Sequence, residues 1–241
     1  MRAGHAPLAS PDVLPDALVF DLDGTIADTE SIEYRSVEQV WGDHGAVYGL
    51  DRWATIVGQS WAPAWVGELR DELARRGEPV PSPDDLHRRQ HEHKRVLLAD
   101  LRPRPGMVEL ITAARNDDVR LAIASNSPLR WVEERLDQLG LRHHFEHLST
   151  VDVASRPKPH PAPYLEACDA LDARPTRSVA FEDSTTGTAS AVAAGLFTIA
   201  CPGPLTEGHD LSAAHWSIRS HDDLSLVSIV QRFEAHIADR T

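Results

Sequence analysis

The sequence predicts an α/β fold in which a three-layer α/β/α core holds a parallel sheet and carries an inserted helical domain. Two patterns along the chain support this prediction. Short apolar runs with little polar alternation, typical of strands buried on both faces, alternate with segments of helical periodicity. Between residues 29 and 103 helical patterns continue without a convincing buried strand. The alternation predicts the layered core, and the interruption predicts the insert.

Five runs have the length and apolar character of buried strands. They cover residues 17–20, 121–124, 148–151, 178–181 and 197–200. Apolar side chains spaced at i, i+3, i+4 and i+7, as in residues 107–114, predict helices between them. Ser127 is the expected N-cap of the helix after the second run, with Pro128 as its first residue. In such a chain, ligands are expected at the carboxyl ends of the strands.

Proline-rich stretches mark the expected boundaries of the domains. Three prolines interrupt the first fifteen residues, and residues 102–106 contain two more where the chain returns to the core pattern. The predicted parts are a flexible tail at 1–15, a core domain at 16–28 and 104–241, and a helical cap domain at 29–103.

Composition narrows the class of protein further. The formal net charge of -13 would repel a polyanion at long range, so nucleic-acid binding is not expected. Cys168 and Cys201 have no neighbour at the spacing of a zinc or redox motif, and both are expected to be reduced core residues. Neither a signal peptide nor a membrane span is predicted. We therefore expect a cytoplasmic protein, acting as a monomer on a small molecule.

Two carboxylates follow the first predicted strand. Asp21 and Asp23 are two residues apart at a strand end, so their side chains should point to the same side of the chain. Carboxylates that close disfavour each other's charge unless a cation compensates. The pattern therefore indicates a metal site or a proton-transfer pair, with Gly24 allowing a tight turn. A solvated corner with two chance aspartates is the alternative at this point.

Polar side chains also follow three later strands. Ser125 and Asn126 precede a helix N-terminus, which is a favourable place for a phosphate oxygen. Lys158 lies in a loop between prolines, and Glu182 and Asp183 offer the hard oxygen ligands that magnesium prefers. Each motif alone is weak evidence. Together they predict one site, because the carboxyl ends of parallel strands meet at one edge of the sheet.

This ordered set of motifs resembles that of the haloacid dehalogenase superfamily. The matching motifs are Asp21-Leu22-Asp23-Gly24-Thr25, Ser125-Asn126, Lys158 and Glu182-Asp183. The position of the helical insert and residues 184–195 are similar to the beta-phosphoglucomutase-like branch. The resemblance implies a Rossmann-like core with a helical cap. It also implies a magnesium-dependent phosphatase acting on a small phosphorylated metabolite, such as a sugar phosphate or a related phosphomonoester.

The resemblance assigns a role to each matching residue. Asp21 would attack phosphorus and form an aspartyl-phosphate, and Asp23 would act first as an acid and then as a base. The implied magnesium ligands are Asp21, Asp23 through its main-chain carbonyl, Asp183 and Glu182. The implied phosphate-binding residues are Ser125, Asn126 and Lys158.

The cap departs from the mutases of this branch. Glu33 stands on or next to the position of a catalytic histidine, and Trp61 stands where an arginine is usual. The cap residues expected to influence substrate choice are Glu33, Gly58, Ser60 and Trp61. These departures favour hydrolysis over the alternative, a beta-phosphoglucomutase-like phosphosugar mutase. Asp23 counts against a dehalogenase, and the complete motif set counts against a module that only binds phosphorylated ligands.

Two further features of the insert have competing interpretations. Four of the six tryptophans lie there, and we expect them mainly to form its core, with Trp61 as the exception that faces the substrate. The polar run at residues 87–95 is either a solvated helix face or a clamp for an anionic group of the substrate. The solvated face is the favoured prediction.

Overall fold

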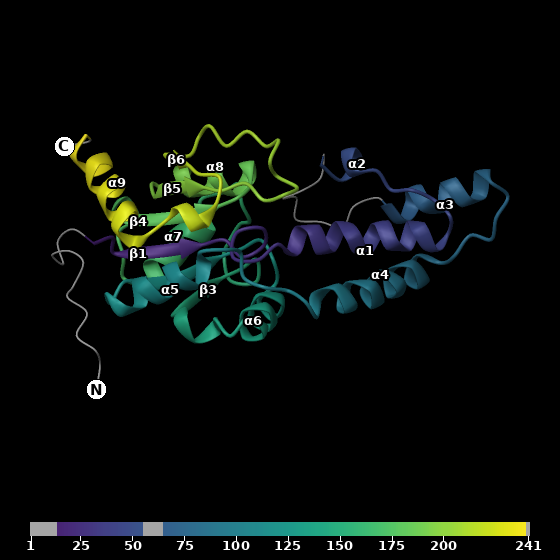
Figure 1. The fold of residues 1–241 in the computed structure, drawn as a ribbon, viewed down its shortest axis with the longest axis horizontal. Coiled ribbons are helices and arrows are strands. Elements are labelled where there is room, and N and C mark those ends of the chain that lie inside the picture. Colours follow the sequence, from purple (N-terminus) through teal and green to yellow (C-terminus); the bar gives the residue numbers. More distant parts are fainter. Residues whose placement is uncertain (1–13, 55–64, 240–241) are drawn as a thin grey trace.

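The computed structural model describes residues 14–54 and 65–239, and a parallel sheet lies at the centre of the larger part. Within the described residues the sheet has six strands in the order β3-β2-β1-β4-β5-β6, and all neighbouring strands are parallel (Figure 1). The strands are β1 (Ala17–Phe20), β2 (Arg120–Ala124), β3 (His147–Ser149), β4 (Ser178–Glu182), β5 (Phe197–Ala200) and β6 (Trp216–Ser217). The predicted α/β fold with a parallel sheet is confirmed.

The strands are buried on both faces because helices cover the sheet from each side. Leu18 and Phe20 of β1 belong to one hydrophobic cluster, which includes side chains of α5, α6 and α9. Ala17 and Val19 point the other way, into a cluster with α7 and α8. The core helices are α5 (Met107–Asn116), α6 (Leu129–Gln138), α7 (Ala162–Ala170), α8 (Thr185–Ala193) and α9 (Leu226–Ala238). The connections in the described part of the chain also contain three short 3-10 helices, η1 (Arg142–His144), η2 (Pro175–Arg177) and η3 (His221–Asp223).

Between β1 and α5 the described residues form four helices, which extend from one side of the core (Figure 1). They are α1 (Thr29–Asp43), α2 (Leu50–Ala54), α3 (Trp65–Arg75) and α4 (Pro83–Leu98). Their buried side chains form a separate hydrophobic cluster that contains Trp41, Trp53 and Trp65. These three tryptophans therefore form the core of the insert, as expected. The extent of a separate cap domain stays a prediction, and Gly58, Ser60 and Trp61 lie outside the described residues.

Local side-chain hydrogen bonds cap the N-termini of α1 and α4. The Asp28 carboxylate accepts from the main-chain N–H of Ser31 at the start of α1. The Ser82 hydroxyl accepts from the N–H of Asp85 at the start of α4, where Pro83 occupies the first turn.

No helix within residues 14–54 and 65–239 is long and apolar enough to cross a membrane.

A buried histidine makes the stability of the core depend on pH. His221 is 2% exposed, and burial together with the positive charge of Arg104 lowers its pKa to about 3. The unfolded chain therefore binds an extra proton between about pH 6.5 and pH 3, so stability falls as the pH falls through that window. At pH 5 the loss is about 2 kcal/mol, at about 1.36 kcal/mol per pH unit.

The test is urea unfolding of the wild type and of His221→Leu at pH 7 and pH 5. The variant lacks the titrating imidazole, so its free energy of unfolding should fall less than that of the wild type on acidification. An equal fall in the two proteins would show that His221 does not carry this dependence.

Candidate active site

Three carboxylates gather beyond the carboxyl ends of β1 and β4. Asp21, Glu182 and Asp183 are buried, and one carboxylate oxygen of each lies within 4.8 Å of the other two. The strand register explains the meeting, because Phe20 of β1 pairs with Phe181 of β4 and the chains continue side by side. The structure thus brings together residues that the sequence placed at two different strand ends.

Lys158 supplies the positive charge of this cluster. Its ammonium donates to Asp21 Oδ1 at 2.7 Å and to Glu182 Oε1 at 2.5 Å, and the residue is 6% exposed. Burial opposes the charge, but the two carboxylates raise the pKa of Lys158 above its usual value. Lys158 is therefore a charged and buried group at the centre of the site.

Asn126 holds the backbone of the lysine loop. The Lys158 N–H donates to Asn126 Oδ1 at 2.8 Å, and Asn126 Nδ2 donates to the Lys158 carbonyl at 3.2 Å. Both polar atoms of the Asn126 side chain thus contact Lys158. The same pair of bonds links the loop after β2 to the loop that carries the lysine.

Ser125 is 1% exposed, and its hydroxyl accepts from the N–H of Ser127 at 3.0 Å. The predicted cap of the following helix is wrong by one residue. Pro128 occupies the cap position, α6 begins at Leu129, and the Asp152 carboxylate accepts from the Leu129 N–H at 2.6 Å. The side chain of Ser127 is used elsewhere, since it donates to Asp23.

Asp23 is held by donors from three segments of the chain. Thr29 Oγ1 donates to its Oδ1 at 2.6 Å, Ser127 Oγ to its Oδ2 at 2.6 Å, and Trp131 Nε1 to its Oδ1 at 2.9 Å. Thr29 begins α1, and Trp131 lies in the first turn of α6. The position of this carboxylate therefore depends on both the insert and the core.

Besides Thr29, Trp131 and Arg104, the site contains two further residues that the sequence motifs do not indicate. Tyr164 is fully buried, and its hydroxyl donates to Glu182 Oε1 at 2.5 Å. Glu30 is half-buried, and burial followed by the charges of Asp23, Glu33 and Asp21 raises its pKa to about 8. Tyr164 could have been noticed in the sequence, because it is a polar residue at a spacing that places it on the apolar face of a helix.

The charge balance of the cluster fits a divalent cation. Burial and neighbouring carboxylates raise the pKa of both Asp21 and Asp183 well above the usual value, with Lys158 opposing the effect at Asp21. Lys158 contacts two of the three buried carboxylates, and the charge of Arg104 acts on the third, Asp183, without cancelling the rise of its pKa. Oxygen ligands grouped in this way are those that magnesium prefers. A buried acidic triad able to hold a metal ion is therefore present.

Arg104 ties the loops around this cluster together. Its guanidinium donates to the Gly24 carbonyl at 2.5 Å, to the Cys201 carbonyl at 3.1 Å and to the Pro202 carbonyl at 2.9 Å. Gly24 has a φ of +90°, and a Cβ there would lie 2.1 Å from Asp183 Oδ2. The turn after β1 therefore needs glycine both for its conformation and for the close approach of Asp183.

Gly187 of α8 gives a testable case of the same close packing. A Cβ at this position would lie 1.9 Å from Glu182 Oε2, a carboxylate whose side chain is fully buried. We expect Gly187→Ala to lower the free energy of unfolding by about 1–3 kcal/mol and to reduce activity, because the carboxylate must move.

Gly67→Ala is the matched control, since Gly67 lies in α3 and a Cβ there meets no atom of the described residues within 4 Å. That substitution should stabilise the protein by about 0.5–1 kcal/mol through helix propensity. Chemical denaturation measures the free energy of unfolding of each variant, and a phosphate-release assay measures its activity. A Gly187→Ala protein as stable and active as Gly67→Ala would contradict the packing seen here.

Glu33, which the sequence singles out in the insert, is already engaged. It forms an ion pair with Lys94 and accepts from Gln90 Nε2 at 2.7 Å, and both partners lie on α4. These contacts join α1 to α4. The run at residues 87–95 therefore contributes to the packing of the insert as well as to its surface.

Comparisons with known proteins agree with this geometry. The family described as haloacid dehalogenase-like hydrolase matches residues 15–195. The phosphorylated carbohydrates phosphatase of Thermotoga maritima is 31% identical over 190 residues, covering 75% of this chain and 82% of the relative. The fructose-1-phosphate phosphatase YqaB of Escherichia coli is 29% identical over 180 residues, covering 74% of this chain and 92% of the relative.

A solved structure shows the same architecture. CbbY from Rhodobacter sphaeroides, in complex with xylulose-1,5-bisphosphate, matches with a TM-score of 0.70 at 28% identity. The match covers 88% of this chain and 97% of the other. The predicted enzyme class, a hydrolase of phosphoric monoesters, agrees with the phosphatases among the relatives. The chain belongs to the haloacid dehalogenase-like hydrolases.

Proposed function

We propose that this protein is a magnesium-dependent phosphatase that hydrolyses a small phosphorylated metabolite through an aspartyl-phosphate. The observation that carries the proposal is the buried cluster in which Lys158 contacts Asp21 and Glu182 while Asp183 lies alongside. Covalent catalysis needs a nucleophile held in place beside groups that tolerate the anionic substrate. Asp21 and Lys158 have these two properties.

In the proposed first step, Asp21 attacks phosphorus and the bond to the leaving oxygen breaks. Lys158 orients the Asp21 carboxylate through its bond to Oδ1 and offers positive charge to the phosphoryl oxygens. Ser125, at the adjacent strand end, is the proposed hydroxyl donor to the same group. Asn126 acts indirectly, because its side chain fixes the backbone of Lys158 through two hydrogen bonds.

Asp23 is the proposed acid and base. It gives a proton to the leaving oxygen in the first step and takes one from the water that hydrolyses the aspartyl-phosphate. Its hydrogen bonds to Thr29, Ser127 and Trp131 set where this carboxylate stands before the substrate arrives.

The proposed magnesium ligands are the carboxylates of Asp21 and Asp183 and the main-chain carbonyl of Asp23. Bound magnesium would offset the repulsion between Asp21 and the incoming phosphate. Glu182 accepts hydrogen bonds from Lys158 and Tyr164, so we assign it the role of positioning Lys158 beside the ion.

Sugar phosphates are the proposed substrate class. Support comes from relatives named for phosphorylated carbohydrates and for fructose 1-phosphate. The alternative, a phosphosugar mutase, is disfavoured because Glu33 occupies the region of the mutase histidine and is bound to Lys94 and Gln90.

The test is release of inorganic phosphate from a panel of sugar phosphates, glycerol phosphates, phosphoglycolate and nucleotides. Turnover should require magnesium and should stop when the ion is chelated. Turnover that is unaffected by chelation would overturn the assigned cofactor. Isomerisation of a sugar monophosphate, tested after addition of a bisphosphorylated sugar, would favour the mutase if it were faster than phosphate release.

A further inference from the structure

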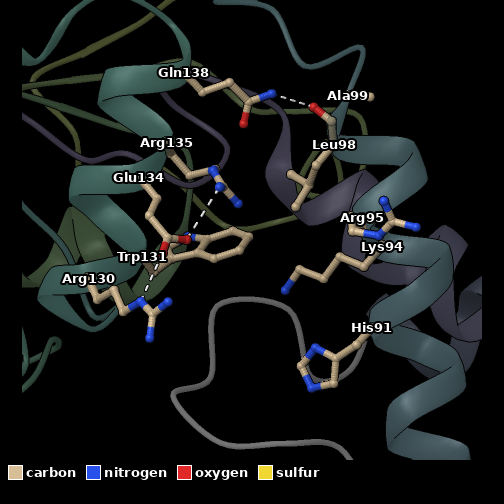
Figure 2. A pocket seen from close by; sticks show the side chains of 10 residues that line it. All are labelled: His91, Lys94, Arg95, Leu98, Ala99, Arg130, Trp131, Glu134, Arg135 and Gln138. Atoms are coloured by element: carbon tan, nitrogen blue, oxygen red, sulfur yellow. Dashed lines mark hydrogen bonds and ion pairs between the residues drawn. The ribbon is translucent and has the colours of Figure 1, made fainter.

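A pocket of about 600 Å³ opens between α4 and α6, beside the site described above (Figure 2). Its lining includes four positively charged side chains and one carboxylate among the described residues. They are Lys94, Arg95, Arg130, Arg135 and Glu134. An excess of positive charge in a hollow is unexpected in a chain with a net charge of -13.

Trp131 connects this pocket to the catalytic carboxylate. Its ring lines the pocket, and its Nε1 donates to Asp23 Oδ1 at 2.9 Å. The ammonium of Lys94 lies 4.1 Å from the ring centroid, and the guanidinium carbon of Arg135 lies 4.5 Å from it. Figure 2 shows the Lys94 side chain reaching from α4 toward Trp131. A leaving group beside Asp23 is therefore one indole ring away from these cations.

The positive charges are only partly balanced by carboxylates. Lys94 pairs with Glu33, while Arg130 and Arg135 share Glu134 at 2.8 Å and 3.5 Å. Arg135 Nε is buried and has no hydrogen-bond partner among the described residues. Four cations thus meet two carboxylates, and a donor is left over. An added anion would supply the missing acceptor and charge.

Lys94 differs from its neighbours in the polar run at residues 87–95. Arg88 pairs with Asp85 and Glu92 at the surface, with 63% of its side chain exposed, as the prediction of a solvated face requires. The Lys94 side chain is only 19% exposed and stands over an aromatic ring. Within this run, Arg88 therefore lies on a solvated helix face, whereas Lys94 lines the pocket.

We propose that this pocket binds a second anionic group, a carboxylate or a phosphate, on the alcohol part of the substrate. The proposal rests on the function proposed above, because it places the leaving group between Asp23 and the pocket. Lys94 and Arg130 face that group from opposite helices, and Trp131 sets the spacing between it and the acid. The enzyme then selects phosphomonoesters whose alcohol carries a further negative charge.

Two matched pairs of esters test the proposal. The first is 3-phosphoglycerate against glycerol 3-phosphate, which differ by a carboxylate in place of a hydroxymethyl group. The second is fructose 1,6-bisphosphate against fructose 1-phosphate, which differ by the second phosphate. We expect kcat/KM to favour the more anionic member of at least one pair by about tenfold or more, mainly through KM. The pair that shows the preference identifies the anion as carboxylate or phosphate.

Lys94→Gln and Arg130→Gln remove one pocket charge each, and the 90% exposure of the Arg130 side chain makes its loss harmless to folding. Either change should lower the preference about tenfold. Arg88→Gln, on α4 outside the pocket lining, should leave the preference unchanged. p-Nitrophenyl phosphate has no second anionic group, so its hydrolysis measures general phosphatase activity in the wild type and in each variant.

The outcomes separate the two proposals. If p-nitrophenyl phosphate is hydrolysed but neither pair of esters shows a preference, the proposed anion-binding role of the pocket is wrong and the proposed phosphatase function stands. A preference that survives both Lys94→Gln and Arg130→Gln also overturns the pocket. Absence of magnesium-dependent turnover of every ester removes the proposed function itself.

Discussion

Replacing Asp21 with asparagine is expected to reduce phosphate release by about 10,000-fold or more, to the background of the assay. Asparagine keeps the shape of the side chain but cannot attack phosphorus to form the acyl phosphate. The measurement is kcat/KM for the best substrate of the panel, determined with magnesium present. Turnover that survives in Asp21→Asn would show that another group is the nucleophile.

Loss of folding would be a trivial cause of inactivity, and the structure argues against it here. Asp21 is buried beside the carboxylates of Glu182 and Asp183 and shares the Lys158 ammonium with Glu182, so a neutral amide removes repulsion from the cluster. Lys158 keeps its bond to Glu182. The free energy of unfolding of Asp21→Asn should therefore equal or exceed that of the wild type. A marked loss of stability would mean that the Asp21 charge is needed for the fold.

Replacing Lys158 with methionine is expected to lower the free energy of unfolding by about 3–5 kcal/mol. The substitution leaves Asp21 and Glu182 buried without their cation, and breaking a buried ion pair from one side has this order of cost. Activity should fall by about 100-fold or more, because the charge that faces the phosphoryl oxygens is lost. Urea unfolding and kcat/KM measure the two effects.

Lys94→Met is the matched control for the stability effect. Lys94 also pairs with a glutamate, but its side chain is 19% exposed, against 4% for Lys158. A single ion pair with more solvent access contributes less, so this variant should lose clearly less stability than Lys158→Met. Equal losses in the two variants would show that burial of the Lys158 pairs is not the cause.

The sequence predicted the strands well where an apolar run is buried on both faces. β1 and β5 have the predicted bounds, because every residue of each is buried. The third run ends at Ser149, two residues earlier than predicted, because Val151 and Val153 lie exposed in a turn. β6 was missed, since Trp216–Ser217 has two residues and no apolar run. Apolar character alone cannot distinguish a strand end from an exposed turn.

The meeting of the site residues could be predicted because a parallel sheet brings its strand ends to one edge. The hydrogen-bond partners of these site residues could not be predicted, because the contacts join side chains that are far apart in the chain. Trp131 reaches Asp23 across 108 positions, and Arg104 reaches Pro202 across 98. Tyr164 has the spacing of a core residue and also donates to Glu182. Spacing indicates which face a residue occupies, but it does not show which polar atom that residue meets.

The roles of Asp21, Lys158 and Asp183 can be seen in a crystal structure with magnesium and beryllium trifluoride, because that fluoride mimics a phosphoryl group on a carboxylate. We expect the trifluoride on Asp21, with Lys158 against its fluorine atoms and magnesium held between Asp21 and Asp183. A trifluoride group bound away from Asp21, or a magnesium ion that does not contact Asp183, would contradict these roles.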